Sequence, residues 1–584
     1  MLGWRRCSTP RAATLHPARH SCTIALIVAI ELLLARAPVF ARLAPELLER
    51  LAARAHRLRV RAGGTLFEAG DPSDALYVLT AGRLEVVDAD QHDRVLRVLG
   101  AGAVVGELGV LTGAPRSATV HARRDAELLA IGQEDVEALL RDAPGFAFAV
   151  ARGLARQLAG EAAPEPGSPP DRRVVALVGI DDAAPVDEIA RLLSGELRRG
   201  GPVTRLDEIA AGQVPSRVLE LLLAEGRRVL LDVRAGQASS AWTAFCLRQA
   251  DVLLAIAGGR RVLLEPRQLQ RLRGCELLAC GPAAAREHLA TIAAQIEPRR
   301  VQSIPAGPMA PERVRAVGRR LAGRSIGLVL SGGGARGLAH LGVLEELEAA
   351  GVTVDRIGGA SQGAIIAGIY AMDRGAAHTI ELCERGYLHR SPTGDWTIPT
   401  TSLIRGRRTE DLVRGAFGAD TTIEDLPLAL FTVSSDLLSG ELVVHRRGSV
   451  VEALCASVAI PGVFPPRPAG ERVLIDGGMR NNLPADIMAA DHEGPVIAVD
   501  VVAPRHKRSG APRVPRLAET LMRSVGFASL DRDGSARRHA DLVISPLVGG
   551  IGMLDWKRLH DAREAGRTAA REALETGPAW LRAQ

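Results

Sequence analysis

Aromatic residues are scarce in this sequence. Phenylalanine, tryptophan and tyrosine make up 3% of the 584 residues, although 47% of the residues are hydrophobic. The cores must therefore be mainly aliphatic, and the hydrophobic fraction excludes a disordered chain. Blocks of like charge are also missing, because the net charge of +6 comes from basic residues spread along the chain. Such a distribution weakly favours an anionic membrane surface as a partner and argues against nucleic acid.

Cysteine is sparse as well. The seven cysteines are an odd number, lie far apart, and include no C-x-x-C pair and no neighbouring histidine cluster. This pattern predicts a reducing compartment and no metal site. We expect no cofactor for catalysis.

The N-terminal apolar run at 23–34 is too short to cross a bilayer, which requires about 20 apolar residues, and Glu31 interrupts it. A signal peptide is one alternative, since Arg5 and Arg6 precede the run and residues 35–37 resemble a cleavage site. The favoured interpretation is that the segment from Leu32 onward forms the first helix of the following domain. We therefore expect a cytoplasmic protein that contacts the membrane peripherally, with secretion less favoured.

The length exceeds what one hydrophobic core supports, and no repeat of fixed period occurs. Changes in apolar periodicity and in proline and glycine content predict a multidomain α/β protein. Its expected parts are a loose leader (1–33), a β-roll with helices (34–160), a linker (161–172), a middle α/β layer with a parallel sheet (173–300), a second linker (301–323) and a C-terminal α/β domain (324–576). The middle layer has no glycine loop after its first strand and is interpreted as a spacer or docking domain.

The C-terminal domain opens on a predicted strand, 325–330, a glycine-rich loop, 331–337, and a predicted helix, 338–350. A loop of this kind directs free N–H groups and the positive end of a helix dipole at one point, which suits an anion or an oxyanion. The loop also fits the dinucleotide motif G-x-G-x-x-G. However, no acidic residue ends a second strand about twenty positions later, and a G-x-S-x-G motif, 359–363, stands there instead.

The G-x-S-x-G motif lies between an apolar strand around Ile357 and an apolar helix, 364–370, which places Ser361 on a sharp strand-to-helix turn. A serine hydroxyl needs a base to take its proton. No downstream histidine lies in a recognisable turn motif, whereas Asp476 ends a strand, 472–475, and begins an Asp-Gly-Gly turn. Ser361 is therefore the predicted nucleophile and Asp476 the predicted base.

Residues 331–337, 359–363 and 476–478, in this order, resemble the patatin-like phospholipases, which are serine–aspartate dyad hydrolases. Residues 323–363, the run 481–486 and the leading module narrow the resemblance to the neuropathy target esterase branch, and it covers nearly everything after residue 34. That branch often has a membrane-spanning helix and several nucleotide-type modules. This sequence shows one such module and no convincing span, so constitutive membrane anchoring is not expected.

The resemblance implies a C-terminal patatin-like α/β hydrolase domain in which Ser361 attacks an acyl ester and Asp476 accepts its proton. Backbone N–H groups of Gly332, Gly333 and Gly334 are expected to stabilise the oxyanion. The further glycines of the three motifs are Gly337, Gly359, Gly363, Gly477 and Gly478.

Three other features of this domain have alternative interpretations. Arg336 is expected either to orient a lipid phosphate or to brace the glycine loop. His340 is expected to pack within its helix rather than to act as a base. The apolar loop 456–466 is expected to line an acyl pocket, to touch the membrane, or to pack in the core.

Residues 106–109 and 115–119 resemble the phosphate-binding cassette of cyclic-nucleotide-binding domains. A carboxylate can accept a hydrogen bond from a ribose hydroxyl, and an arginine fork can pair with a cyclic phosphate. By this resemblance Glu107 binds the 2′-hydroxyl and Arg116 the phosphate, with Ser117 and N–H groups near Gly106 assisting. The alternative is a β-roll that has lost its ligand, and the sequence does not distinguish cAMP from cGMP.

These observations predict an enzyme that hydrolyses acyl esters of phospholipids or lysophospholipids and is regulated by, or tethered through, its N-terminal module. Two alternatives remain open. One is a general carboxylesterase acting on soluble esters. The other is a non-catalytic, cyclic-nucleotide-responsive scaffold.

Overall fold

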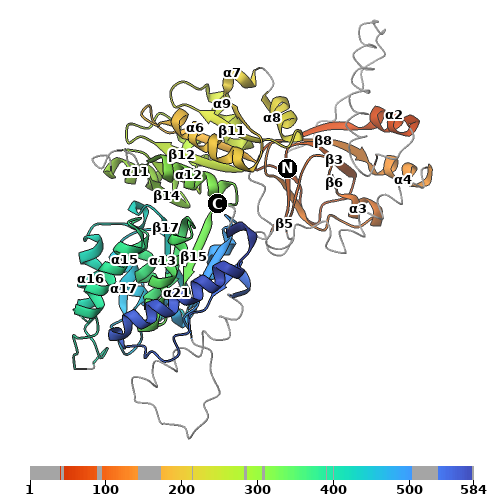
Figure 1. The fold of residues 1–584 in the computed structure, drawn as a ribbon. Helices are drawn as coiled ribbons and strands as arrows, with labels where there is room; N and C mark the ends of the chain where they lie inside the picture. The colour runs from red at the N-terminus through yellow and green to blue at the C-terminus, as the bar shows by residue number, and fades with distance from the viewer. Residues whose placement is uncertain are drawn as a thin grey trace, which may run out of the picture. The chain divides into compact units, whose positions relative to one another are not determined.

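The computed structural model describes residues 40, 45–87, 95–142, 173–212, 215–281, 286–304, 310–389, 391–398, 400–502 and 537–581. The predicted leader and the first linker, 161–172, lie outside these residues. The chain forms two compact units that divide after Ser168. Figure 1 shows the elements of both units, which are described separately below.

The N-terminal unit is a β-roll of two antiparallel four-stranded sheets, which confirms the predicted fold. Its core is aliphatic, with Leu79, Leu84, Val120 and Leu128 among the buried residues. The first sheet contains β1 (His56–Val60), β8 (Ala126–Gly132), β3 (Ala75–Ala81) and β6 (Val104–Val105), the second contains β2 (Thr65–Phe67), β7 (Thr119–Ala122), β4 (Leu84–Val87) and β5 (Val95–Leu99), and the described helices are α2 (Pro45–Arg54), α3 (Glu107–Thr112) and α4 (Gln133–Asp142).

The middle region is an α/β layer with a parallel sheet, also as predicted. Its strand order is β10 (Val203–Leu206), β11 (Arg228–Val233), β9 (Val174–Gly179), β12 (Val252–Ala257), β13 (Glu276–Ala279) and β14 (Arg300–Ser303). The central strand β9 is buried along its whole length, because helices cover a parallel sheet on both faces. The helices are α6 (Val186–Leu197), α7 (Glu208–Ala211), α8 (Pro215–Ala224), α9 (Ser240–Gln249), α10 (Pro266–Arg271) and α11 (Arg286–Ile296).

Much of the segment 301–323, which was expected to be a linker, is folded. β14 continues to Ser303 and pairs with β13, and the segment then forms α12 (Ala310–Leu321). Val314, Val317 and Leu321 of α12 pack into the core of the middle layer. Apolar residues three and four positions apart form one face of a helix, and the proline-rich start of the segment obscured this pattern.

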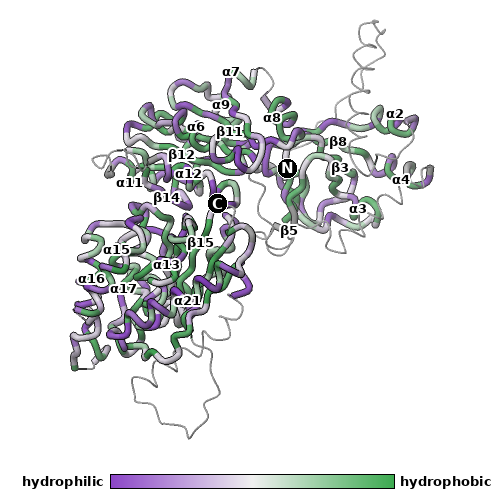
Figure 2. Tube along the Cα trace, in the orientation of Figure 1, coloured by the Kyte–Doolittle hydropathy of each residue, from purple (hydrophilic) through white to green (hydrophobic). Residues whose placement is uncertain are grey.

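The C-terminal domain is built on a mixed sheet of eight described strands. Five are parallel, in the order β17 (Ala429–Asp436), β16 (Val354–Ala360), β15 (Ile326–Leu330), β21 (Val496–Val499) and β22 (Leu542–Ile544), and β20 (Arg472–Asp476), β19 (Arg467–Ala469) and β18 (Leu442–His445) extend the sheet beyond β17 with antiparallel pairing. Every residue of β15 and β16 is buried. In Figure 2, β15 and its neighbouring strands are mainly hydrophobic.

Helices pack closely on this sheet. α13 (Ala339–Ala349) and α21 (Leu559–Thr576) touch through two glycines: an added Cβ at Gly342 would lie 1.9 Å from the Arg563 carbonyl oxygen, and one at Gly566 would lie 1.9 Å from that of Ala339. The other helices that concern the site are α14 (Gln362–Tyr370), α16 (Arg407–Phe417), α17 (Val450–Ser457) and α18 (Ala485–Ala490). The predicted helix 338–350 begins earlier, as a 3-10 turn, η3 (Gly334–Leu338), that leads into α13.

Candidate active site

Ser361 occupies a strained turn between β16, which ends at Ala360, and α14, which begins at Gln362. Its backbone has φ 52° and ψ −125°, a conformation that non-glycine residues rarely adopt. The flanking motif glycines, Gly359 and Gly363, lie against the Leu330 carbonyl oxygen, where an added Cβ would come within 2.7 Å and 2.3 Å of it. The small neighbours therefore let this turn sit directly on the end of β15.

The structure brings the hydroxyl of Ser361 and the carboxylate of Asp476 together. Ser361 Oγ donates a hydrogen bond to Asp476 Oδ2 at 2.6 Å, and Gly478 N–H donates to Asp476 Oδ1 at 2.7 Å. Both side chains are buried, with 7% and 4% of the two residues exposed. Asp476 ends β20, where its strand pairs with Ser434, and the next residue, Gly477, lies against the Val433 backbone.

Burial raises the pKa of Asp476 to about 7, and the hydrogen bonds from Ser361 and Gly478 offset only part of this rise. Among the described residues, no cationic side chain forms an ion pair with Asp476. A carboxylate with a pKa near neutrality can take up and return a proton at physiological pH. The pair therefore has the geometry and the proton affinity required for base-assisted attack by a serine hydroxyl.

The glycine loop lies directly beside Ser361. An added Cβ at Gly332 would be 2.9 Å from Ser361 Cβ, so no other residue fits there. Gly332 N–H donates to the Asn482 carbonyl oxygen at 3.1 Å, and Asn482 Nδ2 donates back to the Gly332 carbonyl oxygen at 3.2 Å. Gly332 therefore has no free N–H for an oxyanion, contrary to the expectation from the sequence. The N–H groups of Gly333 and Gly334 find no acceptor within the described part of the chain, and these two remain available.

Comparisons with known proteins agree with this geometry. Residues 328–489 match the family model of the patatin-like phospholipases, and residues 57–143 match that of the cyclic nucleotide-binding domain. The chain is 36% identical to an uncharacterized NTE family protein of Mycobacterium tuberculosis, over 93% of this chain and 96% of the relative. The chain belongs to the NTE family.

Longer relatives match this NTE family member over part of their length. Patatin-like phospholipase domain-containing protein 6 of Homo sapiens is 30% identical over 76% of this chain and 37% of the human protein. A lysophospholipase of Neosartorya fischeri is 27% identical over 89% of this chain and 42% of its own length. The chain thus spans less than half the length of these two relatives.

Arg336 and His340 act within the loop and its helix in this NTE family member. Arg336 Nε donates to the Ile551 carbonyl oxygen at 2.8 Å, which is the bracing role among the two expected for this side chain. His340 is fully buried, and burial lowers its pKa to about 4. The neutral ring donates from Nε2 to the Ser331 carbonyl oxygen at 2.8 Å, so His340 supports the loop. Its pKa lies too far below neutral pH for His340 to serve as the base. The remaining loop glycine, Gly337, packs against the side chain of Gln362.

Sequence reasoning missed the residues that hold the dyad in place. Ser457, at the end of α17, accepts a hydrogen bond on Oγ from the Ser361 N–H at 3.0 Å. Two residues later, the Ala459 carbonyl oxygen accepts from the Asp476 N–H at 2.9 Å. Both belong to the apolar loop 456–466, so this loop contacts the dyad. Its apolar sequence indicated a place near the site, but nothing in it singled out Ser457.

The predicted nucleotide cassette has its charged residues in place in the β-roll. Gly106 adopts a left-handed conformation with φ 83°, and the buried Glu107 begins α3. The Arg116 guanidinium donates to the carbonyl oxygens of Gly106 at 3.1 Å and Ala75 at 2.8 Å, and it stacks 4.4 Å from the centre of the Phe67 ring. Ser117 is exposed. Arg116 is therefore held against the backbone beside Gly106, where a phosphate would have to compete for its donors.

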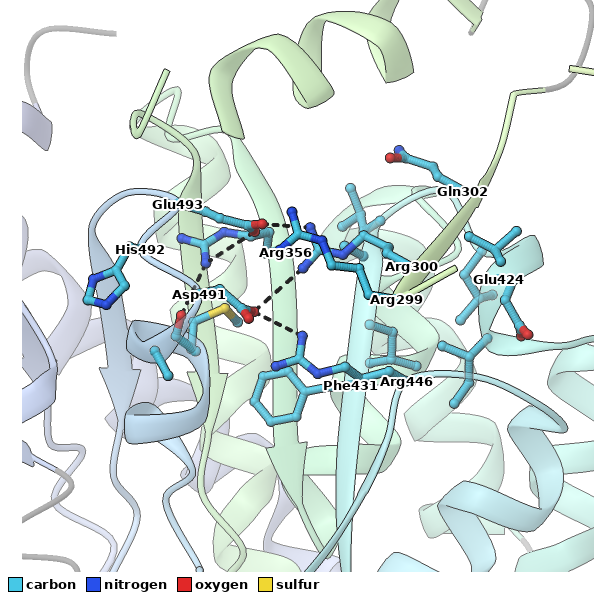
Figure 3. A pocket seen from close by; sticks show the side chains of 18 residues that line it. Arg299, Arg300, Gln302, Arg356, Glu424, Phe431, Arg446, Asp491, His492 and Glu493 are labelled. Atoms are coloured by element: carbon cyan, nitrogen blue, oxygen red, sulfur yellow. Dashed lines mark hydrogen bonds and ion pairs between the residues drawn. The ribbon is translucent and has the colours of Figure 1, made fainter. Parts of the chain in front are cut away.

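A cavity of about 380 Å³ lies at the opposite edge of the catalytic sheet from Ser361. Its lining includes Arg356, near the start of β16, and Ala429, at the start of β17, so it faces the amino ends of these strands. Figure 3 shows its arginines bound to carboxylates: Arg300 to Glu493 at 2.8 Å and Arg446 to Asp491 at 2.9 Å. The cavity lies between β14 of the middle layer and the catalytic domain, separate from the dyad. Ion pairs between its lining residues connect these two parts.

None of the described helices combines the length and the apolar composition needed to span a membrane. No group of histidine, cysteine, aspartate or glutamate side chains in the described part of the chain is arranged to hold a metal ion.

Proposed function

We propose that this NTE family member hydrolyses acyl ester bonds of phospholipids or lysophospholipids with Ser361 and Asp476. The proposal depends on one observation, the 2.6 Å hydrogen bond from Ser361 Oγ to the buried carboxyl group of Asp476, whose pKa is about 7. It is supported by the patatin-like phospholipase match over 328–489 and by a relative that is named as a lysophospholipase.

In the proposed reaction, Ser361 Oγ bonds to the ester carbonyl carbon while its proton passes to Asp476 Oδ2. The tetrahedral intermediate then loses the glycerol oxygen, which takes the proton back from Asp476. Asp476 next accepts a proton from water, which attacks the acyl-serine, releases the fatty acid and restores the hydroxyl of Ser361. One carboxylate thus serves as base and as acid in turn.

The negative charge of the tetrahedral intermediate would be stabilised by the N–H groups of Gly333 and Gly334. Loss of one such donor typically costs about 3 kcal/mol of transition-state stabilisation. Gly332 has a different role, because its two hydrogen bonds with Asn482 hold the loop rigidly against Ser361. We also keep Arg336 as a brace for this loop, since Nε is bound to the Ile551 carbonyl oxygen.

The test is fatty-acid release from lysophospholipid micelles and phospholipid vesicles by the purified full chain. Ser361→Ala and Asp476→Asn should each reduce kcat at least about 10⁴-fold, as in other serine hydrolases that lose a member of the catalytic unit. Ser439→Ala, in the exposed turn after β17, is the matched control and should leave kcat unchanged.

The same assay separates the alternative functions. Hydrolysis of short soluble esters without release from either lipid would favour a general carboxylesterase. Esterase activity that Ser361→Ala leaves unchanged would contradict the dyad. A complete lack of Ser361-dependent hydrolysis would favour a scaffold that responds to cyclic nucleotide.

We further propose that the β-roll binds cAMP or cGMP, with Glu107 on the ribose hydroxyl and Arg116, Ser117 and the N–H groups near Gly106 on the phosphate. The cyclic nucleotide-binding match at 57–143 supports this assignment. Titration calorimetry with each nucleotide tests it. Arg116→Lys keeps the charge but loses the fork and should weaken binding at least about tenfold, whereas Arg123→Lys, on the exposed surface of the same β-roll, should not. No binding of either nucleotide by the wild type would show that the roll has lost its ligand.

We place the enzyme in the cytoplasm at a membrane surface. Cys246, Cys275, Cys280, Cys383 and Cys455, the cysteines within the described residues, are all free thiols. This state is compatible with a reducing compartment.

A further inference from the structure

Exposed large apolar side chains gather at the edge of the catalytic sheet that carries Ser361. Leu437 and Leu438 follow the carboxyl end of β17, and Leu547 and Leu554 follow that of β22. These strands are parallel to β16, which ends at Ser361, so all three carboxyl ends meet at one edge. With Trp396 and Ile398, whose exposed fractions are 60% and 82%, they form what we call the apolar rim: Trp396, Ile398, Leu437, Leu438, Leu547 and Leu554.

Trp396 and Ile398 belong to a short hairpin that is bonded to the active-site loop. Thr397 N–H donates to the Leu403 carbonyl oxygen at 3.0 Å, and Leu403 N–H in turn donates to that of Gly462 at 2.9 Å. Gly462 lies in the same loop, 456–466, that holds Ser361 and Asp476 through Ser457 and Ala459. The hairpin is thus hydrogen-bonded directly to the segment that positions the dyad.

Apolar packing continues from the hairpin to the glycine loop. Ile404, Val463 and Phe464 form a small buried cluster, and Met553 packs against it. The Met553 carbonyl oxygen accepts from the Ala335 N–H at 2.8 Å, next to Gly334. Apolar side chains therefore continue from the hairpin to the glycine loop beside Ser361.

Two cationic side chains stand beside the exposed part of the hairpin. Arg405 and Arg407 are exposed, and neither guanidinium forms an ion pair with another described residue. Asp395 lies nearby, and its Oδ2 accepts a hydrogen bond from the Arg407 backbone N–H at 2.8 Å, not from either guanidinium group. Exposed tryptophan and isoleucine next to arginines that have no ionic partner among the described residues suit the interface of an anionic bilayer, where apolar side chains enter the acyl boundary and cations bind lipid phosphates.

We propose that the apolar rim, together with Arg405 and Arg407, docks the catalytic domain on an anionic phospholipid bilayer with Ser361 facing the lipid. This inference deepens the proposed function and rests on it, because an enzyme that hydrolyses phospholipids has to contact a lipid surface. The rim lies at the edge where the substrate must enter, and its charges complement lipid phosphates. An anionic bilayer fits both observations.

The experiment is co-sedimentation of the full chain with phosphatidylcholine vesicles, with and without phosphatidylserine. The wild type should bind the anionic vesicles more strongly than the neutral ones. The double variant Trp396→Ala, Ile398→Ala should bind about tenfold or more weakly to both kinds of vesicle, because it loses apolar burial. Arg405→Gln, Arg407→Gln should lose roughly tenfold on anionic vesicles and almost nothing on neutral ones.

Matched controls come from the middle layer. Ile209→Ala removes an isoleucine that is 92% exposed, and Arg267→Gln, Arg271→Gln removes two exposed arginines of α10. Both should bind as the wild type does, and far-UV circular dichroism should show that all variants are folded. Ser361→Ala should also bind vesicles normally, so binding is measured independently of hydrolysis.

Two results would overturn the inference. One is wild-type binding to anionic vesicles that the rim and arginine variants leave unchanged, which would place the membrane surface elsewhere. The other is no binding to either vesicle, which would assign the rim to a protein partner. If Ser361-dependent hydrolysis were absent while binding followed the expected pattern, the proposed function would fail and the docking surface would stand.

Discussion

Each of the two edges of the catalytic sheet buries a carboxylate, but the groups that surround the two carboxylates differ. Asp476, at the carboxyl edge, is 4% exposed and accepts hydrogen bonds from a hydroxyl and an N–H group. Glu493, at the amino edge, is 2% exposed and is surrounded by the guanidinium groups of Arg300, Arg320 and Arg356 at 2.8, 3.2 and 3.8 Å. Burial is nearly equal, so the neighbours determine the difference.

The pKa values of the two carboxyl groups move apart accordingly. Burial raises the pKa of Asp476 to about 7. Burial also acts on Glu493, but Arg320, Arg300 and Arg356 outweigh it and hold the pKa of Glu493 below its ordinary value. A carboxylate that stays ionised can join two layers of the protein, whereas a carboxyl group that titrates near neutral pH can transfer protons. The cavity of about 380 Å³ lies at the ionised edge, so the presence of a cavity does not by itself locate the chemistry.

The largest expected effect comes from removing the charge at the amino edge. Glu493→Gln leaves the buried guanidinium groups of Arg320 and Arg356, and the half-buried one of Arg300, without their shared partner, and this should lower the free energy of unfolding by about 3 to 5 kcal/mol. Glu225→Gln is the matched control, because its carboxylate pairs with Arg227 at 2.8 Å on the surface and should cost less than about 1 kcal/mol. Urea unfolding of the full chain measures both losses of stability. Equal losses for the two variants would remove the distinction between paired and exposed carboxylates.

Removing the charge at the carboxyl edge should have the opposite sign. The pKa of Asp476 is about 7 in the folded protein and 3.8 as its ordinary value. The folded protein therefore keeps a proton that the unfolded chain loses, and burying the carboxyl group costs stability that grows as pH rises from about 4 to 7. Asp476→Asn removes this cost, so its stability relative to the wild type should increase by about 2 to 3 kcal/mol between pH 5 and pH 8.

Urea unfolding of both proteins at the two pH values provides this measurement. The control is Asp420→Asn, an exposed carboxyl group whose replacement should show no such dependence on pH. If the stability difference between Asp476→Asn and the wild type were the same at pH 5 and pH 8, Asp476 would be an ordinary carboxyl group and the contrast between the edges would disappear.

The sequence allowed the carboxyl edge to be predicted well because its signals are local. Apolar runs bounded by glycine gave the strands that lead to Ser361 and Asp476, and β20 spans Arg472–Asp476 where a strand at 472–475 was predicted. A strained strand-to-helix turn needs small neighbours, and these appear as motif glycines. The pairing of Ser361 with Asp476 was inferred from the turns in which the two residues lie and from the family resemblance, because 115 positions separate them.

What could not be predicted depends on contacts between distant segments. The Gly332 N–H is paired with Asn482, 150 positions away, so the glycine motif alone could not tell which loop N–H groups are free. The ion pairs of Glu493 could not be predicted either, because its partners Arg300 and Arg320 come from the distant end of the middle layer. The segment 301–323 was misinterpreted because its composition suggests a linker, whereas its apolar face is defined by the core that it covers.

The smallest expected effect concerns the carboxyl edge, where neutral hydrogen bonds, not ion pairs, hold Ser361 in place. Ser457→Ala removes the acceptor for the Ser361 N–H and leaves a buried donor unpaired, which we expect to lower kcat about tenfold by loosening the nucleophile. Ser457 is a positioning residue, so KM for lysophospholipid should stay unchanged and the pH at which activity falls on acidification should remain near 7, because Asp476 is untouched. Ser194→Ala is the control, since its buried hydroxyl binds the Ala190 carbonyl oxygen within α6 of the middle layer and should leave kcat unchanged. A fall in stability that accounts for the whole loss, or a shifted acid limb, would mean that Ser457 acts on the domain or on the base and not on the orientation of the serine.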